Sequence, residues 1–361
     1  MISKKALVFP KQIAHDEYEK VRTFLVNTLK NFDDVLGIYE FGKVTVAGIS
    51  DLDFAIVLRN QPANKKIGEE VAKIEFSEVA KEILCGSTLM VFCEKHFPQI
   101  TIWDDVDVSR LWGKTFKLTN FNQDTVFLLT VCQIMDWLPE RILSLLRLSQ
   151  KESISVAGLL GHLHSLRFTF RKIEQLGIPS YDKLKQYNND IVQLRKSWFS
   201  MKGQKRVNEL VRLFDTAIDI GRSCLLSVAQ WLTSKRYYLF RPGPEELGSF
   251  HLTEDMGYQF LDLSSYMIRL NETAENFVNH GVLLPVPAVW AFHLKTYASL
   301  DGIISRKLRQ TFSIYPSIPA IINPKLLSIL HRRMTLCNEM AEFLGKYKFR
   351  SGLFKFGWFY K

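Results

Sequence analysis

Cysteines are few in this chain, and long apolar runs are missing. The five cysteines among 361 residues stand singly, without a Cys-x-x-Cys pair or a His/Cys spacing typical of metal sites. This excludes a disulfide framework and the common zinc modules, and it indicates a chain with reduced thiols. The longest apolar stretch, residues 281–294, is interrupted by Pro285 and Pro287 and falls short of the roughly 18 residues that a membrane span needs. We therefore expect no integral membrane association.

A signal peptide, internal repeats and low-complexity tracts are also lacking. The N-terminal residues have no apolar core and no small-residue cleavage site, so we expect no secretory leader and a cytoplasmic location. Hydrophobic residues make up 47% and charged residues 23% of the chain, a balance typical of a globular protein rather than a disordered or collagen-like one. A length of 361 residues exceeds one ordinary core, so we expect two domains.

Acidic charge is scarce in the rear of the chain. Residues 1–120 carry 16 Lys and Arg against 17 Asp and Glu, and the remainder carries 31 against 20, so the rear contributes the whole net charge of +10. A basic rear fits an anionic partner. It equally fits a basic surface without such a partner, and composition does not decide between the two.

The front of the chain alternates between helical and strand-like patterns. Apolar residues at three- and four-residue spacing predict amphipathic helices at 15–32 and 65–84. Apolar and β-branched runs predict strands at 35–41, 52–58, 87–93 and 100–108. Mixed elements of this length indicate a small domain of sheet and helix that ends near residue 118.

Behind residue 118 the pattern is almost entirely helical. Periodic apolar residues predict helices at 124–148, 154–176, 183–197, 205–234, 258–280, 294–310 and 324–346. Pro139 is expected to kink or divide the first of these helices, and residues 236–252 are predicted to be a loop. The fold class that follows is α+β, with a small mixed-sheet domain at 1–118 and a mainly helical domain at 119–361.

One segment, residues 38–58, carries the residue types of a catalytic site. An apolar strand leads into Gly42, a second glycine follows at Gly48, and Ser50-Asp51-Leu52-Asp53 opens the next apolar strand. Side chains alternate along a strand, so Asp51 and Asp53 are expected on one face and Leu52 on the other.

The chemistry of this segment points to a metal and a phosphate. Two carboxylates on one face of a strand repel each other unless a cation lies between them, and Mg²⁺ prefers oxygen ligands. Glycines allow a backbone to approach phosphate oxygens closely. A metal beside a phosphate-binding turn predicts phosphoryl or nucleotidyl transfer. If Asp51 and Asp53 are instead a strand-entry cap and a surface residue, no such chemistry follows.

This segment resembles the signature of the DNA polymerase beta-like nucleotidyltransferase superfamily, in which an apolar strand, a Gly-Ser pair, a short loop and Asp-x-Asp follow one another. Phe41-Gly42 matches the entry to the loop. A helix before the motif and a helical domain behind it are similar to the kanamycin-nucleotidyltransferase-like and poly(A)-polymerase-like members. The resemblance implies that Asp51 and Asp53 hold Mg²⁺ or Mn²⁺, and that a nucleoside triphosphate binds at Gly42, Lys43 and Ser50.

Two departures from the family pattern bear on activity. Lys43 stands where the family has a serine that contacts the triphosphate, and a lysine supplies charge but no hydroxyl. The family also uses a third carboxylate on a later strand. Asp107 is our choice for that catalytic position, and Asp105, Asp104 and Glu94 are the further candidates. Alternation puts Asp105 and Asp107 on one face and Asp104 on the other, and the sequence leaves open which face meets the acidic pair.

By this resemblance the chain is an enzyme that transfers a nucleoside monophosphate from ATP or another nucleoside triphosphate to an acceptor hydroxyl and releases pyrophosphate. Asp107 would help to deprotonate that hydroxyl. The basic rear makes an anionic acceptor the expected partner, whether a sugar phosphate, a glycan intermediate or RNA. Two alternatives stay open: an inactive nucleotidyltransferase fold that serves as a nucleotide-binding or interaction module, and a nucleic-acid-binding protein. The sequence does not determine the base, the acceptor or the oligomeric state.

Other conspicuous residues have structural interpretations. His162 and His164 lie two apart in a predicted helix, so they face different ways, and we interpret them as packing residues. The run His331-Arg332-Arg333 is interpreted as a solvent-facing part of a helix. The aromatic and basic tail at 343–361 either binds nucleotides or a membrane surface or packs against the core. Packing is favoured, because dense aromatic residues are rarely left exposed.

Overall fold

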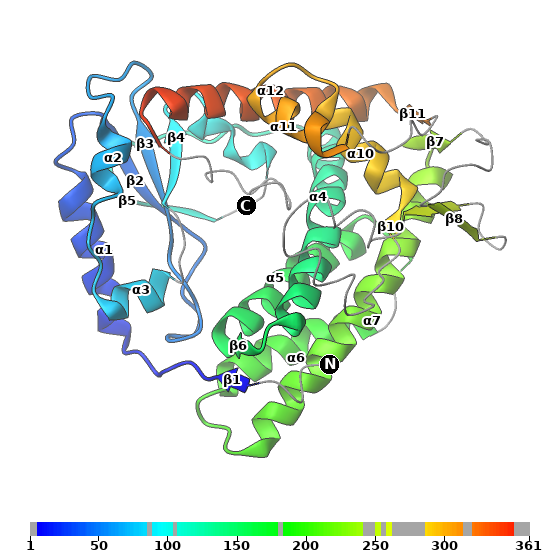
Figure 1. Ribbon diagram of the computed structural model, residues 1–361, viewed down its shortest axis with the longest axis horizontal. Helices are drawn as coiled ribbons and strands as arrows, with labels where there is room; N and C mark the ends of the chain where they lie inside the picture. Colours follow the sequence, from blue (N-terminus) through cyan, green and yellow to red (C-terminus); the bar gives the residue numbers. More distant parts are fainter. Residues whose placement is uncertain are drawn as a thin grey trace.

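The computed structural model describes residues 6–84, 89–103, 107–179, 183–240, 250–253, 258–261, 286–312 and 320–349. These residues combine long helices with small sheets, so the α+β prediction holds at the level of a mixed helix-and-sheet fold. The largest sheet is built from the first third of the chain, and most of the long helices follow it (Figure 1). None of the helices in the described ranges combines the length and apolarity that a bilayer crossing requires.

The largest sheet has four strands in the order β4-β3-β2-β5. They are β2 (Val35–Phe41), β3 (Asp53–Leu58), β4 (Met90–Cys93) and β5 (Val108–Gly113). β2 pairs antiparallel with β3 and β5, and β3 pairs parallel with β4, so the sheet is mixed. β3 is an inner strand whose residues 54–58 are all buried. The predicted strand at 35–41 is confirmed, and the one at 52–58 is confirmed to within one residue.

Helix α1 (His15–Leu29) packs against one face of this sheet (Figure 1). Its buried residues recur at three- or four-residue spacing, which places them on one side of the helix: Tyr18, Val21, Leu25 and Leu29. Arg22 extends from α1 to the buried carboxylate of Glu40 on β2, with Nε–Oε2 and Nη2–Oε1 distances of 2.6 and 2.8 Å. The predicted helix at 15–32 is confirmed, although it ends at Leu29.

Two of the front predictions are wrong in part. The single helix predicted at 65–84 is two short helices, α2 (Ile67–Val71) and α3 (Glu78–Leu84). The Ser77 hydroxyl accepts a hydrogen bond from the N–H of Ala80 at 3.2 Å, and it thereby caps the start of the second helix. The strand predicted at 100–108 is replaced by the 3-10 helix η1 (Phe97–Ile102) and by β5, which starts at Val108. Pro98 lies in the first turn of η1, where its fixed φ suits a helix.

The rest of the chain is dominated by helices. They are α4 (Gln123–Gln150), α5 (Val156–Gln175), α6 (Lys183–Ser197), α7 (Gln204–Ser234), α10 (Ala288–Ala298), α11 (Ile303–Phe312) and α12 (Pro324–Lys346). The helices predicted at 124–148, 154–176, 183–197, 205–234 and 324–346 are confirmed to within two residues at each end. Pro139 lies inside α4 and does not divide it.

Three rear predictions need correction. The helix predicted at 294–310 is α10 and α11, separated at Gly302, whose φ of +126° is incompatible with a continuous helix. The helix predicted at 258–280 begins as strand β9 (Tyr258–Leu261), which pairs with β8 (Phe250–Thr253) and β10 (Val286–Pro287). Residues 262–285 lie outside the described residues. The loop predicted at 236–252 contains β7 (Tyr238–Phe240), which pairs with β11 (Ala320–Ile322). Local periodicity does not reveal strand pairs whose partners are this far apart in the chain.

Contacts between the front and the rear of the chain include a pair of strands and a helix beside the sheet. β1 (Ala6–Val8) pairs parallel with β6 (Ser153–Ser155), so the N-terminal strand lies beside the start of α5. At the other end of the sheet, α12 packs along β4 (Figure 1). There the Nε2 atom of His96 lies 2.7 Å from Oε2 of Glu339. The predicted boundary at residue 118 falls between β5 and α4, and the division into two domains stays a prediction.

Arg333 contradicts the interpretation of residues 331–333 as solvent-facing. Its side chain is buried, with Nη1 2.6 Å from Oδ2 of Asp136 on α4 and 2.7 Å from the hydroxyl of Tyr297 on α10. Nε2 of His293 lies 3.0 Å from the other oxygen of Asp136. A buried ion pair of this kind fixes three helices together. Its partner is too distant in the sequence for helical periodicity to reveal it. The cysteines that the structure describes, Cys93, Cys132, Cys224 and Cys337, are buried free thiols.

Candidate functional site

The loop at residues 42–52 joins β2 to β3, and two glycines shape it. Gly42 has a φ of +71° and Gly48 one of +82°, both in the left-handed region that favours glycine. The N–H groups of Ile49 and Ser50 donate hydrogen bonds to the carbonyl oxygen of Val46, at 3.1 and 2.8 Å. No described atom lies within 4 Å of the position that a Cβ on Gly42 would take. The first turn is therefore open to an approaching ligand.

The second glycine is enclosed by the chain itself. A Cβ on Gly48 would lie 2.4 Å from the carbonyl oxygen of Lys11 and 3.0 Å from the ring of Phe199. The N–H of Gly48 donates to the hydroxyl of Tyr18 at 2.9 Å, and that hydroxyl donates to the carbonyl oxygen of Ser50 at 2.7 Å. Close packing explains Gly48, and Tyr18 on α1 fixes the loop at its far end.

Ser50 is buried, and its hydroxyl organises the loop. Its Oγ accepts hydrogen bonds from the N–H groups of Thr45 and Val46, at 3.2 and 3.1 Å. It also accepts one from Nη2 of Arg195 on α6, at 3.1 Å. The hydroxyl that we predicted to bind a nucleotide is thus engaged within the chain, and it links the loop to the helical part of the fold.

Asp51 and Asp53 lie where the loop enters β3. Leu52 and Phe54 are each 1% exposed, whereas Asp51 is exposed and Asp53 is half-buried, so the expected alternation is present. The N–H of Leu52 donates to the carbonyl oxygen of Ile83 at 3.1 Å, which anchors the strand entry to α3. The two carboxylates therefore stand on a backbone that is fixed by its neighbours. They are the residues of this loop that could hold a divalent cation.

The strand register separates Asp107 from Asp53. Phe41 on β2 pairs with Asp53 on one side and with Val108 on the other, and directly paired residues share a face of the sheet. Asp107 precedes Val108, and its carbonyl oxygen accepts the N–H of Gly42 at 2.8 Å, so it continues the same ladder. Alternation then puts its side chain on the opposite face from Asp53. Asp104 and Asp105, the other candidates on this segment, lie outside the described residues.

Lys43 and Asp107 lie together at the edge of the open turn. Nζ of Lys43 is 3.8 Å from Oδ2 of Asp107, and both side chains are 74% exposed. An exposed pair at this distance contributes little stability, so both groups are available to a ligand. Glu94, the remaining candidate for a third carboxylate, instead lies 3.2 Å from Nζ of Lys114. In the described ranges, no three His, Cys, Asp or Glu side chains are grouped in a way that could hold a metal.

Arg195 on α6 contacts this loop through Ser50, and α6 packs against α5, which carries Arg167 and His164. The sequence patterns did not single out the two arginines. Burial lowers the pKa of Arg195 to about 10, the carboxylate of Asp51 raises it, and the charge of Arg167 lowers it. Burial and the charges of both arginines lower the pKa of His164 to about 3, so its imidazole is neutral. The interpretation of His164 as a packing residue therefore misses its place in a cationic group.

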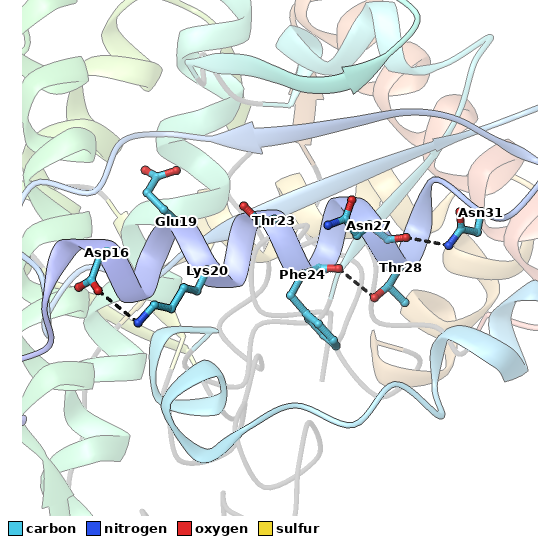
Figure 2. Close-up of a pocket in the computed structure, with 8 residues that line it drawn as sticks. All are labelled: Asp16, Glu19, Lys20, Thr23, Phe24, Asn27, Thr28 and Asn31. Carbon is cyan, nitrogen blue, oxygen red and sulfur yellow. Dashed lines mark hydrogen bonds and ion pairs between the residues drawn. The ribbon is translucent and has the colours of Figure 1, made fainter.

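Two surface hollows of the described residues lie away from this loop. One runs along the outer side of α1, and Figure 2 shows the side chains that line it: Asp16, Glu19, Lys20, Thr23, Phe24, Asn27, Thr28 and Asn31. A second lies where α4, α5 and α7 meet β7, and Phe127, Trp231 and Tyr237 are among its lining residues. Neither contains a residue that we predicted for the site.

The donor set of the loop fits a hard divalent cation. Asp51 and Asp53 offer carboxylate oxygens on one side of a strand entry, and the open turn at Gly42 leaves room for a phosphate beside them. A comparison of the chain with protein families, with curated proteins and with solved structures finds no match.

Proposed function

We propose that the protein is a metal-dependent nucleotidyltransferase whose site is the loop between β2 and β3. The observation that carries this proposal is the position of Asp51 and Asp53 at the entry of an inner strand, directly behind a loop whose first turn is open at Gly42. A helix in front of the loop and a mixed sheet beneath it agree with the α+β arrangement of the family that the sequence resembles. In this proposal residues 1–118 are the catalytic domain and residues 119–361 recognise the acceptor.

Each residue of the loop has a distinct task in the proposed reaction. Asp51 and Asp53 would hold Mg²⁺ or Mn²⁺, and the metal when bound would neutralise the phosphates of the nucleotide. Gly42 gives the phosphates access to the backbone, and Lys43 offers a positive charge to the departing pyrophosphate. Ser50 keeps the loop in shape through the N–H groups of Thr45 and Val46. Positioning and charge stabilisation supply most of the rate in a transfer of this kind.

A third carboxylate has to accept the proton of the acceptor hydroxyl. Our sequence choice, Asp107, lies directly before β5, the strand next to β2, and beside Lys43. The ladder register puts Asp107 on the face opposite Asp53, and Asp104 lies outside the described residues. We keep both residues in the proposal, and the substitutions Asp104→Asn and Asp107→Asn separate them by their effect on turnover.

The acceptor that suits the rest of the chain is anionic. The rear of the sequence carries the whole positive net charge, and Arg195 on α6, which packs against the helix that carries Arg167, donates a hydrogen bond to Ser50 in the loop. A sugar phosphate, a glycan intermediate or RNA would meet this charge. We place the reaction in the cytoplasm, which agrees with four buried free thiols.

The pairing register of the sheet, which puts Asp107 on the face opposite Asp53, supports a second candidate function. If neither Asp104 nor Asp107 meets the metal pair, the protein binds a nucleotide without turning it over and acts as a nucleotide-binding or interaction module. In support of this alternative, the described residues contain no group of three carboxylates that could hold a metal.

Turnover decides between the two candidates. The assay measures pyrophosphate release from each nucleoside triphosphate with Mg²⁺ or Mn²⁺, in the presence of sugar phosphates or RNA. The nucleotidyltransferase proposal predicts metal-dependent release that Asp53→Asn abolishes and that Asp33→Asn, an exposed carboxylate before β2, leaves unchanged. Full activity in Asp53→Asn would contradict the proposed site. Nucleotide binding without release from any of these mixtures would favour the binding module.

A further inference from the structure

Arg195 is a buried cation that makes fewer hydrogen bonds and ion pairs than a buried guanidinium group normally does. The residue is 5% exposed, and its Nη2 donates a hydrogen bond to Oγ of Ser50 at 3.1 Å. Its Nε is buried and has no hydrogen-bond partner among the described residues. A buried guanidinium normally has a carboxylate or several acceptors around it, because an uncompensated charge is costly to remove from water. The Nε–H group of Arg195 therefore has no acceptor among the described residues.

Two side chains on α5 also contain a buried nitrogen that has no described hydrogen-bond partner. Arg167 and His164 are three residues apart, so they lie on one face of the helix. Nε of Arg167 and Nδ1 of His164 are also buried without a partner in the described part of the chain. Neither arginine forms an ion pair with a described carboxylate at 4.0 Å or less. Both arginines are close enough to His164 to act on its pKa, and α5 packs against α6.

Asp51, which the proposed function assigns to the metal, is a negative charge that acts on Arg195. Its field reaches Arg195, but the two side chains do not form a hydrogen bond or an ion pair in the structure. Two arginines beside each other repel unless an anion lies between them. A phosphate fits this position, because its oxygens can accept from both guanidinium groups and it can contact a metal on Asp51 at the same time.

We propose that Arg195 and Arg167, with His164 beside them, form a subsite for a phosphate group next to Asp51. This inference rests on the proposed function, since it names the part of the substrate that the helical region holds. Ser50 then has a second purpose: its hydroxyl anchors one nitrogen of Arg195 and leaves Nε for the ligand. The phosphate belongs either to the nucleoside triphosphate or to a phosphorylated acceptor.

The test is calorimetric titration of inorganic triphosphate and of inorganic phosphate into the full chain, in EDTA and without any added metal. The subsite predicts binding of at least one probe. Arg167→Gln should weaken that binding about tenfold or more, which is the usual effect of removing a charge-assisted hydrogen bond. Arg195→Lys keeps a cation but removes Nε, and it should weaken binding similarly. Lys196→Gln, an exposed cation next to Arg195 on the same helix, is the matched control and should bind as the wild type does.

Each outcome bears on the proposal. Inorganic triphosphate bound much more tightly than phosphate assigns the subsite to the nucleotide, and equal binding assigns it to a phosphorylated acceptor. Absence of binding by either probe, or equal binding by wild type, Arg167→Gln and Arg195→Lys, overturns the subsite. Arg167→Gln serves as the second variant because, among the described residues, no hydrogen bond or ion pair joins Arg167 to the loop, whereas Arg195 is bonded to Ser50.

Failure of the subsite and failure of the proposed function have different signatures. Metal-free phosphate binding that depends on Arg167, without pyrophosphate release from any nucleotide, would retain the subsite and remove the enzyme. Metal-dependent release that Asp53→Asn abolishes, with no phosphate binding that depends on Arg167, would retain the enzyme and remove the subsite.

Discussion

The hydroxyl of Tyr18 on α1 donates a hydrogen bond to the carbonyl oxygen of Ser50, over 2.7 Å, and accepts one from the N–H of Gly48, over 2.9 Å. Tyr18 is 1% exposed, so both bonds are shielded from water. One side chain of the helix thus fixes the loop immediately before Asp51. The geometry of the candidate site depends on α1 as well as on the loop's own residues.

Tyr18→Phe should make the loop less ordered while it keeps the packing of the aromatic ring in the core. The ring stays and the hydroxyl is lost, which leaves two buried backbone groups without their partner. We expect the free energy of unfolding to fall by about 1–3 kcal/mol. We also expect nucleotide binding to weaken roughly tenfold because the loop is less ordered. Urea denaturation and calorimetry measure the two effects.

Tyr187→Phe is the matched control for this substitution. Tyr187 is also buried, and its hydroxyl donates to the carbonyl oxygen of Leu163 at 2.8 Å, away from the loop. It should lose comparable stability and keep wild-type affinity for nucleotide. Equal loss of affinity in the two variants would show that Tyr18 acts only through global stability.

The two loop glycines should respond differently to alanine. Gly42→Ala meets no described atom within 4 Å, so its cost is the left-handed backbone alone, about 1 kcal/mol. Gly48→Ala adds a Cβ at 2.4 Å from the carbonyl oxygen of Lys11, and roughly 3 kcal/mol is expected in total. Thermal or urea unfolding ranks the two variants, and a smaller cost at Gly48 would contradict the packing described for it.

Buried histidines should make the fold sensitive to acid. Burial and the charges of Arg195 and Arg167 lower the pKa of His164 to about 3, whereas the unfolded chain protonates it near 6.5. Below pH 6.5 the unfolded state binds more protons, so stability is lost as the pH falls. For His164 alone the loss between pH 6.5 and pH 5 is about 2 kcal/mol. Burial also lowers the pKa values of His96 and His293, which act in the same direction.

Urea unfolding at several pH values measures this dependence. His164→Gln should flatten the slope between pH 5 and pH 7, whereas His15→Gln, at an exposed position, should not change it. A slope that His164→Gln leaves unaltered would mean that this imidazole is protonated in the folded protein as easily as in the unfolded chain.

The pair of Arg22 and Glu40 should stabilise the packing of α1 on the sheet. Glu40 is 6% exposed, and both of its oxygens accept hydrogen bonds from Arg22. Glu40→Ala leaves the guanidinium without this partner and should cost about 3 kcal/mol. The double substitution Arg22→Met/Glu40→Met replaces the pair by apolar contact and should recover most of that loss. Chemical denaturation tests both, and a double variant as unstable as the single one would contradict this interpretation.

Much of the fold could be predicted from local patterns. The helices at 183–197 and 324–346 and the strand at 35–41 have the predicted bounds, so local apolar patterns were enough to define them. The alternation of Asp51, Leu52 and Asp53 also follows from the strand period. Elements whose limits depend on a cap or a distant strand, such as the helix at 65–84 and the strand β7, were predicted wrongly.

The residues of the helical region that lie at the candidate site could not be predicted from the sequence. Arg195 meets Ser50 across 145 positions of the chain, and no local pattern distinguishes it from the other arginines of the rear helices. Arg333 was assigned to solvent together with His331 and Arg332 as one polar run, although it forms the buried pair with Asp136. Long-range charge pairs of this kind depend on how the helices pack, which periodicity does not specify.

The most direct test of the central claim is calorimetric titration of each nucleoside triphosphate into the protein with Mg²⁺ or Mn²⁺, compared with the double variant Asp51→Asn/Asp53→Asn. The account predicts that one or more nucleotides bind in the presence of metal, and that the double variant loses the metal-dependent part of that binding while it stays folded by circular dichroism. Binding of the same strength in the double variant, or no binding of any triphosphate to the wild type, would contradict a metal and nucleotide site at these two carboxylates.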